Sequence, residues 1–195
     1  MARAGNYRAN RIPTTPGLEY LSEPLLTSLT SGVFAVGAKR PFMADDIEGL
    51  CHVADYQFGA GAGRGLFADP DELSVTRTSS GRPRQIHGPD GRIGTYESDG
   101  RLRLGLAGGR RLQETLDSPA YRVVVGDESE PYVREGRNAF AKFVTNADEA
   151  IRPRDEVLVE HTDGSLLAVG RAELSGAGMT AFETGMAVKV RDGRQ

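Results

Sequence analysis

The last third of the chain consists of short apolar runs separated by tight turns, and this pattern constrains its fold more than any other feature. In residues 186–191, Met or Val at every second position alternates with Lys189 and Arg191, as in a strand that buries one face. Residues 156–161 and 165–174 are two further strand-like runs, and the Asp163-Gly164 pair between them is typical of a β-hairpin. Several short strands with two small helices predict a small β-barrel that is capped by helices.

The middle of the chain predicts a separate α+β unit. Residues 45–54 combine an aspartate pair suited to an N-cap with apolar residues at helical spacing, so we expect a helix there. Two strand-like runs, 92–97 and 101–106, flank Asp99-Gly100, a second hairpin signal. A short helix around Leu112 closes the unit.

A Ser-Pro pair after that helix marks a boundary, because the residue before proline is disfavoured in a helix. We therefore expect three parts: a tail with a helical extension (1–45), a small α+β domain (46–120) and the barrel (121–195). Within the first part, the leucines of 18–29 predict a helix and 33–36 predict a short strand.

Composition narrows the partners and cofactors. With 24 Lys and Arg against 27 Asp and Glu, the net charge of -3 excludes a protein that coats nucleic acid by bulk electrostatics, so RNA contact requires a local basic patch. The single cysteine, Cys51, excludes an intramolecular disulfide and a zinc site of several thiolates, and we expect no metal and no cofactor. No stretch approaches the length of a membrane span or resembles a signal peptide, so we expect a cytoplasmic protein without a membrane partner.

Residues 59–65 form a glycine-rich run that could be read as a phosphate-binding loop. No Lys-Ser or Lys-Thr pair follows it, and no strand precedes it. We interpret the run as a flexible or tightly packed turn.

The last third contains four blocks of residues that belong together: EGRNAFAKFV (135–144), RPRDEVLVE (152–160), LLAVGRAEL (166–174) and ETGMAVKVRDG (183–193). In order, spacing and residue type, these blocks resemble the PUA domain at the C-terminus of archaeal tRNA-guanine transglycosylases. Two earlier blocks, ADYQFGAGAGRGLF (54–67) and LGLAGGRRL (104–112), resemble the domain that precedes PUA in those archaeosine-forming enzymes. The resemblance implies the α+β class, with a small α/β domain followed by a C-terminal PUA-type β pseudo-barrel with short helices.

The resemblance implies a pseudo-barrel that holds tRNA around the acceptor stem and its single-stranded 3′ end. RNA ends offer unstacked bases and close phosphates, which suit aromatic side chains, cations and exposed backbone N–H groups. The residues of these types in the matching blocks and just before them are Arg134, Gly136, Arg137, Phe140, Lys142, Arg171, Lys189 and Arg191.

Each of these residues also has a structural interpretation. Phe140 is equally compatible with the barrel core, and Lys189 and Arg191 are compatible with the solvated face of an edge strand. A second RNA contact at Arg82, Arg84 and Arg92 competes with the reading of residues 79–91 as a solvated basic turn. After Ser175, two glycines replace the helix-forming residues typical of the family, so we expect a short helix there.

The catalytic barrel, aspartate nucleophile and zinc site that the resemblance implies for full-length transglycosylases have no counterpart in this sequence, and no catalytic residue is assigned. Three hypotheses stay open. The chain could be a tRNA-binding accessory subunit of archaeal tRNA modification, working with a separate catalytic protein and without its own active site. It could instead be the non-catalytic half of a split tRNA-guanine transglycosylase that needs both halves for activity. The third hypothesis is a protein-docking module that has lost RNA binding.

Overall fold

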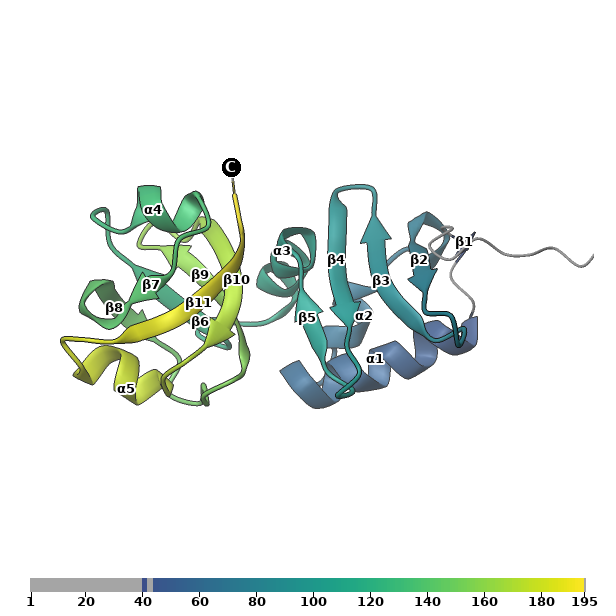
Figure 1. The fold of residues 1–195 in the computed structure, drawn as a ribbon, viewed down its shortest axis with the longest axis horizontal. Coiled ribbons are helices and arrows are strands. Elements are labelled where there is room, and N and C mark those ends of the chain that lie inside the picture. Colours follow the sequence, from purple (N-terminus) through teal and green to yellow (C-terminus); the bar gives the residue numbers. More distant parts are fainter. Residues whose placement is uncertain (1–39, 42–43, 195) are drawn as a thin grey trace, which may run out of the picture. The chain divides into compact units, whose positions relative to one another are not determined.

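Two β-sheets organise residues 40–41 and 44–194, the part of the chain that this computed structural model describes (Figure 1). Five strands form the first sheet in the order β1-β2-β3-β4-β5, and six form the second in the order β7-β11-β10-β9-β6-β8. Both sheets, as far as the structure describes the chain, belong to one compact unit. The expected α+β class is confirmed, whereas the helix expected in 18–29 and the strand expected in 33–36 lie outside the described residues.

The first sheet is antiparallel throughout. The predicted hairpin around Asp99-Gly100 joins β4 to β5, with Leu102 and Leu104 buried. The predicted basic turn over 79–91 is wrong in its middle, which forms strand β3, because Ile86 is buried in the core between the half-buried Gln85 and His87. The strands are β1 (Arg40–Pro41), β2 (Ser74–Arg77), β3 (Pro83–Gly88), β4 (Gly91–Tyr96) and β5 (Leu102–Leu104).

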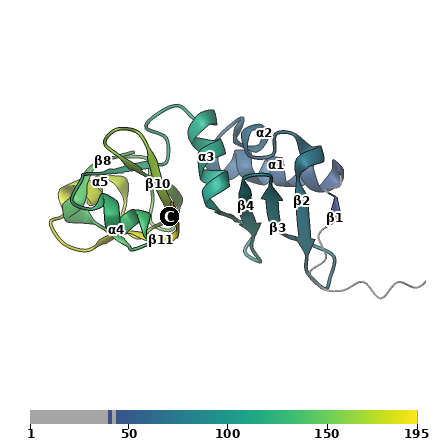
Figure 2. The ribbon, with the colours of Figure 1, turned by 90° about the horizontal axis from the view of Figure 1, so that it is seen from above.

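Three helices, α1 (Ala44–Phe58), α2 (Ala62–Leu66) and α3 (Leu106–Thr115), cover one face of this sheet, and a 3-10 turn η1 (Pro70–Glu72) follows α2 (Figure 2). The helix predicted from 45–54 is confirmed, and α1 buries Leu50, Ala54 and Phe58 at helical spacing.

The glycine-rich run 59–65 is a turn only over its first residues. Gly59 and Gly61 have positive φ angles, and helix α2 begins at Ala62. Gly63 allows α2 to approach α1, because a Cβ at this position would lie 2.5 Å from the carbonyl oxygen of Cys51. The expectation of a turn through residue 65 is therefore corrected: burial of Ala62 and Leu66 favours a helix there.

The second sheet curls into a nearly closed barrel, with β6 and β9 parallel and its other strand pairs antiparallel. The hairpin predicted around Asp163-Gly164 joins β9 to β10, so this prediction is confirmed. Three short helical elements cap the barrel, and the last one is as short as expected; the Ser175 hydroxyl accepts its N-capping hydrogen bond from the Gly178 N–H at 3.2 Å. The elements are β6 (Arg122–Val125), α4 (Glu130–Arg134), β7 (Ala139–Phe140), η2 (Ala141–Phe143), β8 (Val144–Ala147), β9 (Glu156–His161), β10 (Leu166–Ala172), α5 (Gly176–Ala181) and β11 (Met186–Gly193).

The barrel and the first sheet share a core. Leu158, Leu166 and Val169 come from barrel strands but pack into the hydrophobic cluster of the helices and the first sheet. Helix α3 lies directly against β10, where Gly109 leaves room for the side chain of Val169. This packing fixes the junction at which two cavities form.

Candidate nucleic-acid interface

Strand β11 brings the residues predicted for RNA binding together. Lys189 lies opposite Arg171 of β10, and Met186 lies opposite Phe140 of β7. At the other end of β11, the backbone of Gly193 packs so closely on Arg134 and Gly136 that a Cβ would clash with both. The predicted residues therefore lie on β11 or on the segments next to it.

The cations of the β10–β11 pair differ in how firmly they are held. Arg171 donates to Glu173 at 2.7 Å. Arg191 donates to both carboxylate oxygens of Glu156, one of them at 2.8 Å. Lys189 is exposed and forms no ion pair with any described residue, so its ammonium is the cation of this group that is free for a ligand.

The buried carboxylate of Glu156 holds Arg191 of this group in place. The Glu156 side chain is only 5% exposed and also accepts a hydrogen bond from the Leu104 N–H at 3.2 Å. Burial raises the pKa of Glu156, and the Arg191 guanidinium opposes that rise. Arg191 therefore compensates a buried carboxylate, which limits its freedom to turn toward a ligand.

A second group pairs cations with aromatic rings on the segment that runs from α4 through β7 to η2. The Arg137 guanidinium lies 5.4 Å from the centroid of the Tyr132 ring, and the Lys142 ammonium lies 4.5 Å from that of Phe143. Phe140 is 46% exposed. Such pairs offer a stacking surface beside a positive charge, a combination that suits unpaired bases and phosphates.

Arg134 and Gly136 complete this segment. Arg134 pairs with Glu130 at 2.8 Å within α4, and Gly136 ends the helix with a φ of +89°. Tyr132 was not predicted, because residues five apart do not share a helix face and only the turn at Gly136 brings Arg137 to its ring.

The three arginines predicted as a second contact do not share a loop. Arg82 lies 5.6 Å from the Tyr96 ring centroid, and Arg84 is exposed on β3. Arg92 donates to Asp192 of β11 at 3.1 Å, so it ties the first sheet to the barrel.

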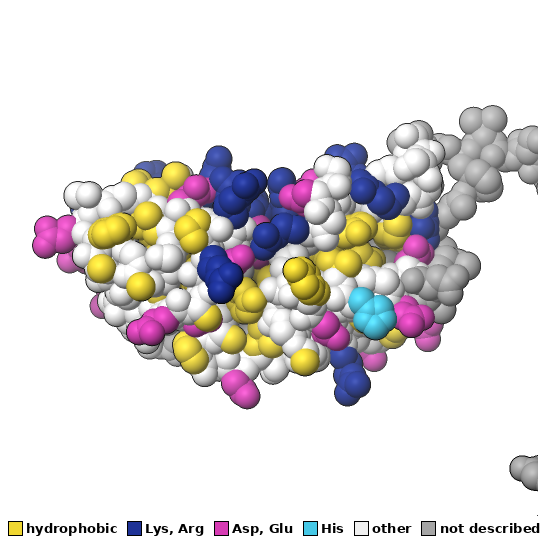
Figure 3. Space-filling model, turned by 90° about the horizontal axis from the view of Figure 1, so that it is seen from below, with side chains coloured by type: hydrophobic (Ala, Val, Ile, Leu, Met, Phe, Trp, Pro, Cys, Tyr) yellow, Lys and Arg dark blue, Asp and Glu magenta, His cyan; other side chains and the backbone are white. Residues whose placement is uncertain are grey.

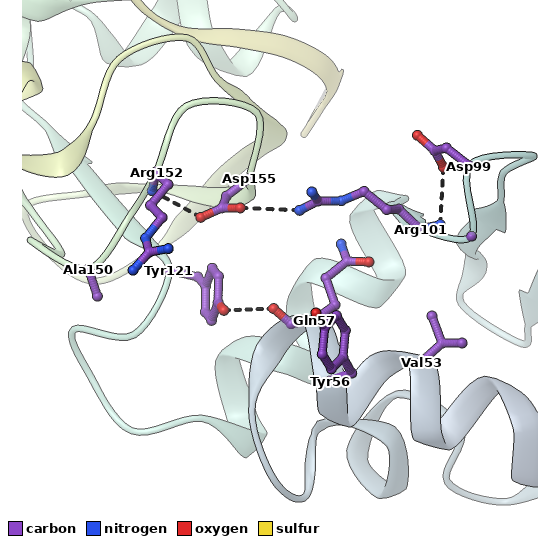
Figure 4. Close-up of a pocket in the computed structure, with 10 residues that line it drawn as sticks. Val53, Tyr56, Gln57, Asp99, Arg101, Tyr121, Ala150, Arg152 and Asp155 are labelled. Carbon is purple, nitrogen blue, oxygen red and sulfur yellow. Dashed lines mark hydrogen bonds and ion pairs between the residues drawn. The ribbon is translucent and has the colours of Figure 1, made fainter.

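A cavity of about 490 Å³ lies between α1, the β4–β5 turn and the barrel loop 150–155 (Figure 4). Tyr56 and Tyr121 provide its aromatic rings, and Arg101 and Arg152 its cations. The Tyr121 hydroxyl donates to the Gln57 carbonyl at 2.6 Å, and Arg101 donates to Asp155 at 3.1 Å.

A second cavity of about 180 Å³ shares Asp99 and Arg101 with the first. Viewed from the side of α1, Lys and Arg side chains gather across the middle of the surface (Figure 3). The cavity residues Tyr56, Arg152 and Arg154 were not predicted from the sequence, because only the fold brings α1 close to the 150–155 loop. The arginines that line the second cavity are Arg101, Arg103, Arg154, Arg171 and Arg191.

The described residues include no group of three or more His, Cys, Asp or Glu that could hold a metal ion. They also include no helix long and apolar enough to cross a membrane.

Sequence comparison assigns the barrel and the preceding unit to known domain classes. Residues 121–194 match the PUA domain, and residues 48–119 match the patch-forming domain C2 of tRNA-guanine transglycosylase. Two solved structures share this fold. A hypothetical protein from Pyrococcus horikoshii has a TM-score of 0.61 at 24% identity and covers 81% of this chain and 95% of its own. A PUA domain protein from Aeropyrum pernix has a TM-score of 0.58 at 14% identity, with coverages of 80% and 86%.

The chain carries a C2 domain followed by a PUA domain, and in both it is similar to the C-terminal part of archaeal tRNA-guanine(15) transglycosylases. The protein of Thermococcus kodakarensis is 42% identical over 174 residues, which are 89% of this chain and 29% of that protein. The protein of Pyrococcus furiosus is 45% identical over 156 residues, 80% of this chain and 26% of that protein. The chain thus spans less than a third of the length of these relatives, and the resemblance inferred from the sequence blocks is confirmed.

Proposed function

We propose that this chain binds tRNA through the surface along β11 of its PUA domain. The observation that carries the proposal is the unpaired Lys189 on β11, together with the Arg137–Tyr132 and Lys142–Phe143 pairs on the segment whose strand β7 pairs with β11. The relatives are named for a reaction on tRNA, which supports tRNA as the RNA. The acceptor stem and its 3′ end are the part we expect here, because unpaired ends expose bases for stacking.

The test is filter binding of tRNA over a series of salt concentrations. Each phosphate contact that is lost should flatten the dependence of log K on log salt by about 0.7–0.9, the range spanned by single strands and B-form duplexes. We expect the triple variant Arg137→Ala/Lys142→Ala/Lys189→Ala to bind at least tenfold more weakly, with a flatter salt dependence.

Arg64→Ala/Arg110→Ala is the control for loss of positive charge elsewhere, to be compared per charge removed, because both arginines are exposed on helices of the C2 domain and line neither cavity. Arg191 is left intact, since its loss would unpair the buried Glu156 and confuse binding with stability. If the wild-type chain does not bind tRNA, or binds it without salt dependence, the proposal is wrong and a protein-docking role becomes the better account.

We further propose that the bound tRNA is held for guanine exchange by the catalytic domains of a transglycosylase, in the archaeosine pathway. As an accessory subunit, this chain would have no active site of its own and would raise the catalytic protein's affinity for tRNA. As the non-catalytic half of a split enzyme, it would be required for exchange. The similarity to the C-terminal part of such enzymes supports both forms.

A guanine-exchange assay with purified catalytic protein separates these two forms. An accessory role predicts a lower KM for tRNA on addition of this chain, with kcat nearly unchanged. A required half predicts no exchange without it. Equal activity with and without this chain, on short and on full-length tRNA, would exclude both the accessory role and the required half.

A further inference from the structure

Tyr56 is an aromatic side chain displayed at the rim of the larger cavity. Its side chain is 94% exposed, although α1 buries Leu50, Ala54 and Phe58 on its other face. The neighbouring Gln57 is fixed, because its side-chain amide exchanges two hydrogen bonds of 2.8 Å with the backbone of Leu102. Tyr56 therefore projects from a rigid wall, with its ring free to accept a planar partner (Figure 4).

The opposite wall presents two arginines without carboxylate partners. The guanidinium groups of Arg152 and Arg154 form no hydrogen bond or ion pair with the described residues, whereas Arg101 pairs with Asp155. Arg152 lines the larger cavity and Arg154 the smaller one.

The loop that carries these arginines is firmly held. The Arg152 N–H donates to the Asp155 side chain at 2.9 Å, and the Arg154 N–H donates to the Ala172 carbonyl at 2.7 Å. Arg154 has a φ of +80°, a left-handed conformation that favours glycine. An arginine is thus held beside the smaller cavity in a strained backbone conformation.

The two cavities adjoin at Asp99 and Arg101. A volume of about 490 Å³ lies in the range of small-ligand sites, large enough for one nucleotide. The arginines of the smaller cavity continue from there toward Arg171, which lies opposite Lys189 of β11. Cations and one exposed aromatic ring therefore follow one another from α1 of the C2 domain to the PUA strand.

We propose that the larger cavity receives one unpaired nucleotide of the bound RNA, with its base stacked on Tyr56 and its phosphate held by Arg152. Arg154 holds the next phosphate along the strand. This inference rests on the proposed tRNA binding and extends it from the PUA domain to the C2 domain.

The experiment compares two RNAs on the full chain: a stem-loop with an unpaired four-nucleotide 3′ overhang, and the same stem with a blunt end. For the overhang RNA, we expect Tyr56→Ala to weaken binding about tenfold, in the range of one lost base–aromatic stack. Arg152→Ala should flatten the slope of log K against log salt by about 0.7, the value for one phosphate of a single strand. For the blunt RNA, both variants should bind as the wild type does.

Arg154→Gly is a variant whose weaker binding could not be attributed to a failure to fold. Glycine suits the left-handed backbone, so this variant should keep or raise the melting temperature while it weakens binding of the overhang RNA. Phe182→Ala is the control for Tyr56→Ala, because Phe182 is also an exposed aromatic side chain but lines neither cavity. A 2-aminopurine base in the overhang should lose fluorescence on the wild-type chain and keep it on Tyr56→Ala.

Several outcomes would overturn the inference. Unchanged binding of the overhang RNA by Tyr56→Ala and Arg152→Ala would leave tRNA binding on β11 in place and exclude the cavity. Equal weakening on overhang and blunt RNA would indicate contact with the duplex backbone instead of an unpaired nucleotide. Absence of binding of either RNA or of tRNA by the wild-type chain would overturn the proposed function together with this inference.

Discussion

Arg122 shows how a charged residue stabilises the start of the barrel from inside. Its side chain is 7% exposed and donates to Glu160, which is 8% exposed, at 2.8 Å. Glu160 also accepts a hydrogen bond from the Gln113 side chain at 2.8 Å. The other N–H groups of Arg122 donate to backbone carbonyls in the last turn of α3 and in its connection to β6, those of Gln113, Leu116, Asp117 and Ala120.

Replacing Arg122 by Met should lower the free energy of unfolding by about 3–5 kcal/mol, because Glu160 would remain as a buried charge without a cation. The measurement is urea unfolding of the purified chain. The double variant Arg122→Met/Glu160→Leu removes that charge and should recover part of the loss. The losses in free energy of unfolding of Arg122→Met and Glu160→Leu are also measured separately. If the double variant loses as much as these two losses added together, the hydrogen bonds to the carbonyls, and not the ion pair, account for the effect.

At the scale of elements, helix α2 depends on the absence of a side chain at Gly63. A Cβ there would meet the backbone of Cys51, which cannot rotate away as a side chain can. Gly49 is the natural contrast, because it lies exposed inside α1 with nothing within 4 Å of an added Cβ.

The same substitution should therefore have opposite effects at these two positions. Gly63→Ala should destabilise the chain by about 1–3 kcal/mol through overpacking between α1 and α2. Gly49→Ala should stabilise it by about 0.5–1 kcal/mol, because alanine is the better residue inside a helix. Thermal unfolding followed by circular dichroism checks both, and a loss of stability in both variants would contradict the packing argument.

Helices and strands with regularly spaced buried side chains could be predicted from the sequence. Helix α1 and the hairpins β4–β5 and β9–β10 follow such periodicity, with turns marked by Asp-Gly pairs. Strand β3 was missed because Gly and Pro flank a single core residue, Ile86. Leu106 was expected to end a strand, but it begins α3, because its neighbours Ala107 and Gly108 are buried against the sheet.

At the scale of the whole molecule, the two domains share hydrophobic surface. Leu158, Leu166 and Val169 face the core of the C2 domain and are absent from the cluster that fills the barrel. A PUA domain produced alone would expose all three side chains to water.

We expect residues 121–194 alone to be less stable than 44–194 by roughly 4.5–9 kcal/mol, at about 1.5–3 kcal/mol for each of the three side chains. Urea unfolding of both fragments measures the difference, and 44–194 should unfold in one transition. In the short fragment, changing the three residues to Thr should improve solubility. Equal midpoints for the two fragments would mean that the shared core adds no stability.

The sequence by itself determined the class of fold. It also determined which side chains of β11 face outward, because side chains alternate between the two faces of a strand. It could not determine that Arg191 is held by a buried Glu156, since their distance depends on how β9, β10 and β11 pair. Nor could it place Tyr56 and Arg152 on the walls of one cavity, since the two residues lie almost a hundred positions apart in the chain. Those neighbours were decided by the packing of α3 and the first sheet against the barrel, because only that contact brings the C2 and PUA domains together around the cavities.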